Sequence, residues 1–536
     1  MKKINVLEQK FITCLMLDGN ISEKNICEVL EQSHRIKDIL DSDNLFPFAI
    51  QRLLSVLLYR SHDIVDFKDW KKMWDSGKFN MDAINNYLLK WQDRFYLNDD
   101  KHPFMQSSDL KNSDKKCSIF KLEFSSTSQG SLFDHRMHNR SYRNININGV
   151  IKNLINYNTW FVVTGQHRAS LFILKMAAPS NGSKSAMAMI LKGQNLFETL
   201  CYLTVPLKNL KADLCVFNDC PENDFGRPVW ELDNDAQRYL GKSGEPYGPM
   251  HYLTFPAHPM LLVFDENGNV EDSMLSSPGL PSVGKKRDPF NMSLAKDPCG
   301  LFVYIEKDNA FRNILRYEIS KKMWTNAYAL LEKFHGRREG AYFGLLNFYM
   351  FAKFEGCVNV GNCSVDTFGM LFHERGAKEA SLFDSFHLEV PDPENVRLVD
   401  DFLYEQTEVP EKLWTAFQEV IQCGFKDKDD TSERNKLLRD IMKKDVFKFL
   451  EPQSIMFWQE VNLLFNEIYI RYLNGEDPDA EWKDGLKRIC QNVSQNFCES
   501  LTNWELKKTY YKKCKLNILK RQKKILKNKK DSKEGD

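Results

Sequence analysis

The sequence has no long apolar stretch and no sign of an export signal. In its 536 residues, no run of apolar residues approaches the ~18 consecutive residues that a membrane helix needs. The opening residues, 1–5, lead into Glu8 and Gln9 and not into the apolar core of a signal peptide. Its 13 cysteines, without such a signal, are typical of reduced thiols. We therefore expect a cytoplasmic protein that makes no contact with a membrane.

Motifs for phosphate or metal binding are incomplete. Residues 241–243, Gly-Lys-Ser, resemble the end of a phosphate-binding loop, but the glycine required five residues earlier is Ala236, so a turn is favoured. Cys215 and Cys220 have no second pair at zinc spacing, which favours ordinary buried or surface thiols over a metal site.

Signatures of catalysis are also scarce. His62-Asp63 resembles one dyad of metal-dependent phosphohydrolases, but it stands alone after an apolar stretch, which favours a helix end. Residues 134–136, Asp-His-Arg, have no nucleophile near them in the sequence. The motifs H-E-x-x-H, G-x-S-x-G and G-x-G-x-x-G do not occur. The sequence therefore predicts neither an enzyme nor a bound metal or cofactor.

The charges balance overall but are uneven along the chain. Lys and Arg number 74 and Asp and Glu 73, for a net charge of +1. From Lys507 onward there are 13 basic and 3 acidic residues, so the remainder carries −9. With 42% hydrophobic residues, the chain can bury a large core. A globular body with a basic C-terminal segment suggests a local contact with an anionic partner.

The first part of the chain mixes strand and helix patterns. Residues 15–21 place apolar side chains on both sides of Asp18-Gly19, which predicts a β-hairpin. Ser22 is expected to cap a helix that runs to about Ile36. The other predictions are a helix with Ala49, Leu53, Val56 and Leu57 on one face, a helix over Met81–Phe95, a strand over Leu301–Ile305, and loops over 107–150, 176–186 and 265–300.

The last part of the chain shows helical patterns only. In residues 458–472 large apolar side chains recur at spacings of three and four, and a second helix follows Pro478. With segments 398–423 and 432–449, this predicts four helices joined by short turns, and Pro410 should kink or split the first.

The predicted fold class is therefore α+β. A large mixed N-terminal domain (1–393) is followed by a C-terminal four-helix bundle (394–506). A basic tail (507–536), helical or disordered, completes the chain.

Residues 91–106, Trp-Gln-Asp-Arg-Phe-Tyr-Leu-Asn-Asp-Asp-Lys-His-Pro-Phe-Met-Gln, form a distinctive segment. It resembles the W-x-D-x-F-Y-L…H-P-F-x-Q signature of the CasA family, the large subunits of the type I-E CRISPR surveillance complex called Cascade. Weaker similarities follow in the same chain order at 133–136, 192–200, 368–391 and 457–482. The resemblance agrees with the architecture predicted from periodicity.

This resemblance implies a role in RNA-guided DNA binding and not in catalysis. CasA-like subunits dock at the 5′ end of the CRISPR RNA (crRNA), recognise the protospacer-adjacent motif (PAM) in double-stranded target DNA, open the DNA beside it and help recruit the helicase–nuclease. The implied partners also include the backbone, small and crRNA-capping Cascade subunits. A helical-bundle scaffold protein of a ribonucleoprotein complex, without DNA reading, is the alternative.

The resemblance also suggests a loop that reads the PAM. The family's glycine loop falls on Ser180, Asn181, Gly182 and Ser183, next to Lys184. Small residues permit close approach of the backbone to a DNA groove, and here two serines stand in place of glycines. An ordinary surface turn is the alternative.

Two further groups complete the implied PAM site. Lys285 and Lys286, next to Arg287, are the candidates for the family's groove-contacting lysine; alternatively they are solvated or bind only phosphate. The family's strand-separating wedge falls near His373 and Arg375, where its usual amide side chain is missing, so that one of these two would stack on a base.

The basic tail offers a separate nucleic-acid contact. Lys512 and Lys513 follow two tyrosines, and residues 520–524 add four more cations. Neutralised phosphates release counterions, which gives affinity that depends on salt and not on sequence. The displaced DNA strand is the predicted partner, and a solvated helical extension is the alternative.

Overall fold

The structure is a computed structural model of the chain. It describes residues 3–112, 116–122, 146–160, 187–214, 221, 223–233, 247–254, 260–276, 297–305, 310–314, 341–358, 362–372, 378–389, 409–421, 423, 433–473, 476–501 and 504–527. These group into two compact units, 3–314 with 341–389, and 409–527. The predicted mixture of helix and sheet is confirmed. The domain boundary at 393 lies outside the described residues and stays a prediction. Among the described residues, no helix is long and apolar enough to span a membrane.

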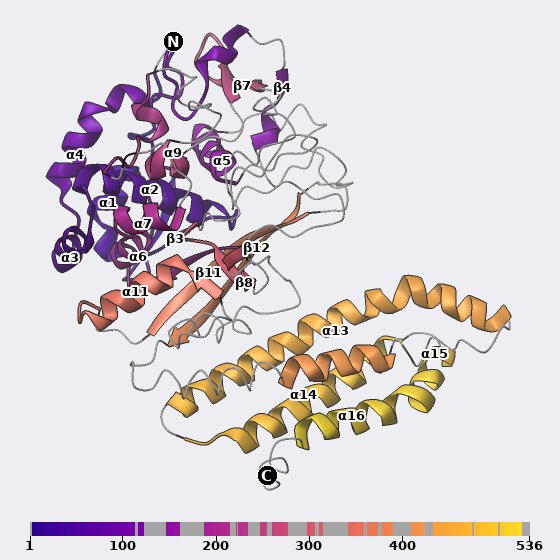
Figure 1. Ribbon diagram of the computed structural model, residues 1–536. Helices are drawn as coiled ribbons and strands as arrows, with labels where there is room; N and C mark the ends of the chain where they lie inside the picture. The colour runs from indigo at the N-terminus through magenta and orange to yellow at the C-terminus, as the bar shows by residue number, and fades with distance from the viewer. Residues whose placement is uncertain are drawn as a thin grey trace. The chain divides into compact units, whose positions relative to one another are not determined.

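The first unit is built around one enclosed helix, α2 (Phe46–His62). The sequence predicted one apolar face, but every side chain from Phe48 to Tyr59 is buried. A helix enclosed on all sides lies at the centre of a core. Because each buried Leu or Ile contributes about 1.5–3 kcal/mol, α2 contributes strongly to the stability of this unit. Figure 1 shows α2 among the helices that contact it: α4 (Met81–Lys90), α5 (Ile147–Trp160), α6 (Leu196–Leu203) and α9 (Gly248–Thr254).

The N-terminal hairpin is confirmed. β1 (Ile12–Met16) pairs antiparallel with β2 (Ile21–Lys24), and Gly19 takes a positive φ of 86° in the turn. β3 (Ile36–Leu40) pairs with the other edge of β1.

The helix expected from Ser22 to Ile36 is wrong at both ends. Ser22 lies in β2, paired with Cys14 of β1, so its backbone belongs to the sheet. The helix α1 (Ile26–Glu31) begins after Asn25 instead. The side-chain oxygen of Asn25 accepts a hydrogen bond from the backbone N of Glu28 at 2.9 Å. In return, the Glu28 carboxylate accepts one from the backbone N of Asn25 at 3.0 Å. This reciprocal cap sets the helix start.

The signature segment 91–106 buries Phe95, Leu97 and residues 103–106 in the core. The helix predicted over Met81–Phe95 ends at Lys90, and a 3₁₀ helix (Gln92–Phe95) follows. Buried Gln106 donates to the carbonyl of Leu97 at 2.8 Å and accepts from the backbone N of Leu262 at 2.8 Å. Both ends of the amide are thus satisfied, and the segment is tied to a strand far along the chain.

Every strand pair that the structure describes is antiparallel. The predicted strand Leu301–Ile305 is confirmed, whereas the segments expected as loops at 107–150 and 265–300 contain β4, α5 and β7. One three-stranded sheet has the order β4-β7-β6, with β4 (Lys116–Ser118), β6 (Met260–Phe264) and β7 (Val270–Ser276). A second has the order β10-β8-β9, with β8 (Leu301–Ile305), β9 (Ala310–Ile314) and β10 (Ala341–Phe343). The remaining helices of this unit are α3 (Phe67–Asp75), α7 (Leu207–Leu214) and α11 (Gly344–Phe354).

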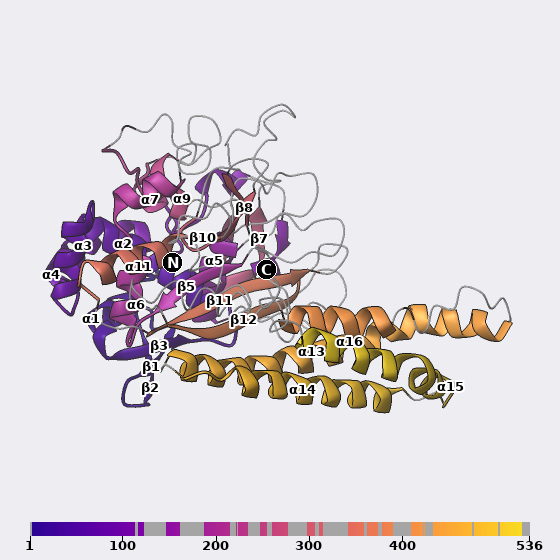
Figure 2. The same ribbon diagram turned by 60° about the horizontal axis from the view of Figure 1, so that its bottom comes forward.

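The second unit is helical in its described parts. Residues 432–449 and 458–472 were predicted as separate helices, but α13 (Glu433–Leu473) is continuous through an exposed Pro452. Figures 1 and 2 show α13 beside α14 (Asp479–Ser500), which in turn contacts α16 (Lys515–Lys527). Residues 409–421 form a further helix that contains Pro410.

Close packing joins the helices of the second unit. A Cβ added to Gly485 of α14 would lie 2.4 Å from a methyl group of Leu464 of α13, so the Leu464 side chain packs directly against the backbone of α14. The chain from Lys507 onward is packed as well: α15 (Trp504–Thr509) continues through a π-helical turn (Tyr510–Cys514) into α16. The Tyr510 ring lies 5.7 Å from that of Phe497. As far as Lys527, the predicted tail is therefore part of this unit.

The C-terminal end of α2 accounts for His62-Asp63 and confirms the predicted helix end. Asp63 is the C-cap residue, in the left-handed region with φ 48°. His62 Nδ1 lies 2.8 Å from Ser61 Oγ, and its Nε2 accepts from the backbone N of Asn80 at 3.2 Å. A ring nitrogen that accepts must be unprotonated, so His62 is held neutral.

We expect His62 to make stability depend on pH. Burial lowers the pKa of His62 below its ordinary value of 6.5. Because the unfolded chain then binds the proton more readily, this side chain contributes stability that is fully present above pH 6.5 and is lost as the pH falls through its folded-state pKa. Thermal unfolding of the wild type and of His62→Gln, measured from pH 6.5 downward, compares how much stability each protein loses. Parallel losses in the two proteins would contradict it.

Candidate nucleic-acid interface

The structure describes two of the twelve predicted contact residues. Lys512 and Lys513 are exposed on the π-helical turn. The others lie outside the described residues: Ser180, Asn181, Gly182, Ser183, Lys184, Lys285, Lys286, Arg287, His373 and Arg375. They belong to three segments of the chain, which were predicted to read and open DNA, and the described residues beside each segment show where it joins the fold.

The first loop joins a three-stranded sheet. It leads into β5 (Ala188–Lys192), which pairs antiparallel with β11 (Asn362–Phe372). Ala188 at the start of β5 lies opposite Phe368, near the end of β11. The residues after Gly182 therefore enter the sheet at the end where β11 finishes.

The loop that holds His373 and Arg375 joins the same end. β11 pairs on its other edge with β12 (Lys378–Glu389), and the last pair of this hairpin is Phe372 with Lys378. The connection between these two residues is the predicted wedge. Two segments that are far apart in sequence thus leave the sheet in the same direction, and the β11–β12 hairpin extends four residues beyond the partner of Ala188.

The loop that holds Lys285–Arg287 returns to the fold beside the start of β5. Gly300 forms a β-bridge with Ala188, and the backbone N of Met189 donates to the carbonyl of Cys299 at 2.7 Å. All three predicted loops therefore have an attachment point at the same end of the sheet.

A buried ion pair fixes the last of these attachment points. Arg52 of α2 donates to both oxygens of Asp297 at 3.3 and 2.8 Å, and the Tyr252 hydroxyl donates to Asp297 at 2.8 Å. Burial, the largest single influence, would lower the pKa of Arg52, but the charge of Asp297 and its hydrogen bond, together with Cys299 and Tyr252, raise that pKa. Burial also raises the pKa of Tyr252. The segment before β8 is thereby held rigidly against the central helix.

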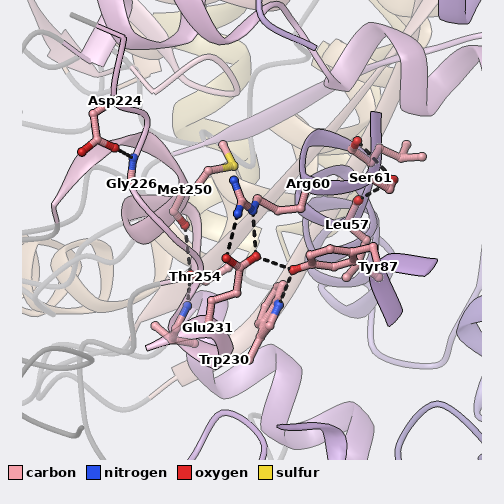
Figure 3. Close-up of polar contacts among 12 residues, drawn as sticks. Leu57, Arg60, Ser61, Tyr87, Asp224, Gly226, Trp230, Glu231, Met250 and Thr254 are labelled. Atoms are coloured by element: carbon pink, nitrogen blue, oxygen red, sulfur yellow. Dashed lines mark hydrogen bonds and ion pairs between the residues drawn. The ribbon is translucent and has the colours of Figure 1, made fainter. Parts of the chain in front are cut away.

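A second buried carboxylate ties other elements to α2 (Figure 3). Arg60 donates to the two oxygens of Glu231 at 2.7 and 2.8 Å, and the hydroxyl of Tyr87 donates to Glu231 at 2.7 Å. The indole of Trp230 in turn donates to the Tyr87 hydroxyl at 2.7 Å. Burial, followed by the charge of Glu231, raises the pKa of Tyr87. Because the carboxylate is fully paired, we interpret this network as structural.

A cleft of about 1060 Å³ lies among residues of α1 to α4 and the segments between them. Its lining is balanced in charge and gives no preference for a polyanion: Arg35, Lys72 and Lys78 against Glu31, Asp69 and Asp82. Within the described ranges, His, Cys, Asp and Glu side chains form no group of three that could hold a metal ion.

Sequence reasoning missed the residues that position the loops. Arg52 and Asp297 are 245 residues apart, so no local pattern could pair them. A signal was nevertheless present: Arg52 is a charged residue among the mostly apolar residues 45–58, and a buried charge needs a partner.

The fold now defines a class: a mixed unit built on an enclosed helix and small antiparallel sheets, followed by a helical unit. The family model described as CRISPR-associated protein Cse1 matches residues 5–493. The chain therefore belongs to the Cse1 family of CRISPR-associated proteins, which confirms the resemblance found in residues 91–106.

Individual relatives are more distant. A CRISPR-associated protein CasA/Cse1 from Thermus thermophilus is 31% identical over 140 residues, which cover 25% of this chain and only 27% of that relative. Among solved structures, Thermus thermophilus CasA matches with a TM-score of 0.68 at 19% identity, over 98% of this chain and 99% of that one. Thermobifida fusca Cse1 matches with a TM-score of 0.66 at 15% identity, over 98% and 97%. A chain of a CRISPR RNA-guided surveillance complex matches with a TM-score of 0.67 at 11% identity, over 98% of this chain and 100% of that one. At these identities the structural matches show the fold.

Proposed function

We propose that this chain is the large subunit of a Cascade-type, RNA-guided surveillance complex in the cytoplasm. It recognises the PAM in duplex DNA, promotes strand opening and R-loop formation, and helps recruit the helicase–nuclease without cleaving DNA itself. Its partners are the crRNA, the backbone, small and crRNA-capping subunits, and the target DNA. We also propose that the C-terminal domain is a four-helix bundle and that the first domain docks the crRNA.

One observation carries the proposal: the three loops expected to read and open DNA attach at one end of one sheet. Guide pairing reads the target, so the protein needs to read only a short duplex segment. Such a reader requires several side chains held together on a rigid support. The pairing of β5 with β11 and Gly300, and the Arg52–Asp297 ion pair, supply that support. Membership of the Cse1 family adds independent support.

We expect the complex to select PAM sequences only when it contains this subunit. An electrophoretic binding assay on a randomised-PAM duplex library, with and without the subunit, measures this selection. A good base contact discriminates by ~1–3 kcal/mol, so preferred PAMs should bind about five- to a hundred-fold more tightly. Equal selection without the subunit would favour the scaffold alternative.

Two variants sharpen the same assay. Gly182→Trp should weaken binding to PAM duplex and spare a target already unpaired beside the PAM, because no duplex reading is then needed. Lys286→Ala should relax selection if the ammonium reaches a base edge, and weaken all PAMs equally if it touches only phosphate. Equal losses on duplex and pre-opened DNA for Gly182→Trp would show that this loop supports assembly or folding instead.

A further inference from the structure

The exposed side of the helix from α15 to α16 combines aromatic rings with lysines. Trp504 is 73% exposed and Tyr511 is 53% exposed. They are seven residues apart, close to two turns of an α-helix, so their backbone positions lie on one side of the helix about 10 Å apart along its axis. The ammonium of Lys515 lies 4.9 Å from the centre of the Tyr511 ring. We define the stacking face by its exposed residues: Trp504, Lys508, Tyr511, Lys512 and Lys515.

Packing holds the Tyr511 ring in place. The preceding Tyr510 turns inward, where its hydroxyl donates to the carbonyl of Ser494 at 3.0 Å. The two tyrosine rings meet edge to face with centres 5.8 Å apart. The π-helical geometry of this turn is rare and is often found at functional positions. A ring that is already ordered loses little entropy when a flat ligand stacks on it.

We propose that the stacking face binds single-stranded nucleic acid, with bases stacked on Trp504 and Tyr511. The inference rests on the proposed function, because an RNA-guided complex that opens DNA leaves one strand displaced. Every base has a π-face, so such stacking is tolerant of sequence, as an arbitrary target requires. Residues 506–527 include ten Lys and Arg and no Asp or Glu, which attracts a polyanion. The family-model match ends at residue 493, before this face begins.

The buried side of the same helix argues against a membrane ligand. A basic amphipathic helix binds an anionic bilayer by inserting a free apolar face. Here Tyr510, Cys514 and Ile518 are buried within the helical unit, and Cys514 Sγ donates to the carbonyl of Val420 at 3.8 Å. Stacked bases need only the exposed rings, so nucleic acid fits the face better.

The test uses fluorescence anisotropy of the full chain with an oligothymidylate and with an abasic oligonucleotide of equal length, which keeps the phosphates and lacks the bases. Tyr511→Ala and Trp504→Ala should each weaken binding of the oligothymidylate at least about fivefold. Both should leave binding of the abasic strand nearly unchanged. Tyr511→Phe should bind like the wild type, because the ring remains. Leu516→Ala, at a site 64% exposed on the same helix, is the matched control without a ring and should have little effect.

Further arms identify the ligand. Repeating the titrations with an oligouridylate tests whether the bound strand is RNA or DNA. If Tyr511→Ala and Trp504→Ala weaken binding of oligothymidylate more than binding of oligouridylate, the displaced DNA strand is supported as the ligand. Equal losses on natural and abasic strands, or no loss in either alanine variant, would overturn the proposal. Ring-dependent binding to phosphatidylserine vesicles in place of oligonucleotides would also overturn it. The wild-type complex is assayed for PAM selection in parallel, so that a failure of the proposed function is seen separately.

Discussion

Asp297→Asn is expected to destabilise the first unit by about 3–5 kcal/mol, because it leaves the guanidinium of Arg52 buried without a counter-charge. The chain has two compact units, so the change is best measured locally, by hydrogen exchange. Protection of the α2 amides should fall by about two to four orders of magnitude, since each 1.4 kcal/mol is tenfold. In the assembled complex, PAM binding should weaken as well, because the loop of Lys285–Arg287 loses its fixed end.

Asp100→Asn is the matched control for this change. Asp100 forms an ion pair with Lys111 at 2.8 Å, but its side chain is 94% exposed, and such pairs contribute at most about 1 kcal/mol. Adding Arg52→Met to Asp297→Asn should restore part of the lost protection, because the unpaired charge is then removed. Similar exchange in Asp297→Asn and Asp100→Asn would mean that the buried pair does not hold this segment.

Replacing the exposed lysines of the C-terminal helix should flatten the salt dependence of DNA binding by the complex. The variant carries Lys→Gln at positions 512, 513, 520 and 523, all exposed. The slope of log affinity against log salt should fall by ~0.7 for each lost contact on single strands, or ~0.9 on duplex. If all four touch phosphate, binding near 0.1 M salt should weaken by about two orders of magnitude. Arg521 is left unchanged because it pairs with Glu419 at 2.7 Å.

The structure decides the design of this experiment. Deletion of residues 507–536 would follow from the sequence alone, but it would remove Tyr510, Cys514 and Ile518 from the core of the helical unit. Substitution at exposed positions changes the charge and keeps the packing. The control carries Lys→Gln at 37, 68, 72 and 90, four exposed positions of the first unit. An equal change of slope in the two variants would show that net charge matters and not this helix.

Local patterns were sufficient for several elements of the fold. The Asp18-Gly19 hairpin, α2, the strand Leu301–Ile305 and the helical character of the second unit all follow from turn residues and apolar periodicity. These signals act between residues that are neighbours in sequence, so they are visible before folding. The segment 91–106 likewise identified the family, which the family model confirms.

Boundaries failed where two local preferences competed. Ser22 is a good helix cap, but its pairing with β1 places it in a strand, and the reciprocal cap at Asn25 starts the helix three residues later. The apolar pattern suggested separate helices over 432–449 and 458–472, yet α13 continues between them through Pro452. At Ser22, pairing with β1 outweighed the local preference for a helix cap.

The sequence by itself determined the family, the mixed fold class and the basic composition of the C-terminal segment, because each depends on residue types and their spacing. Only the tertiary structure decided that β5, β11 and Gly300 place the attachment points of three distant loops toward one end of a sheet. It also decided that the C-terminal helix buries Tyr510 and exposes Tyr511. Both outcomes depend on strand pairing and helix packing between residues far apart in the chain, and such contacts leave no periodic trace in the sequence.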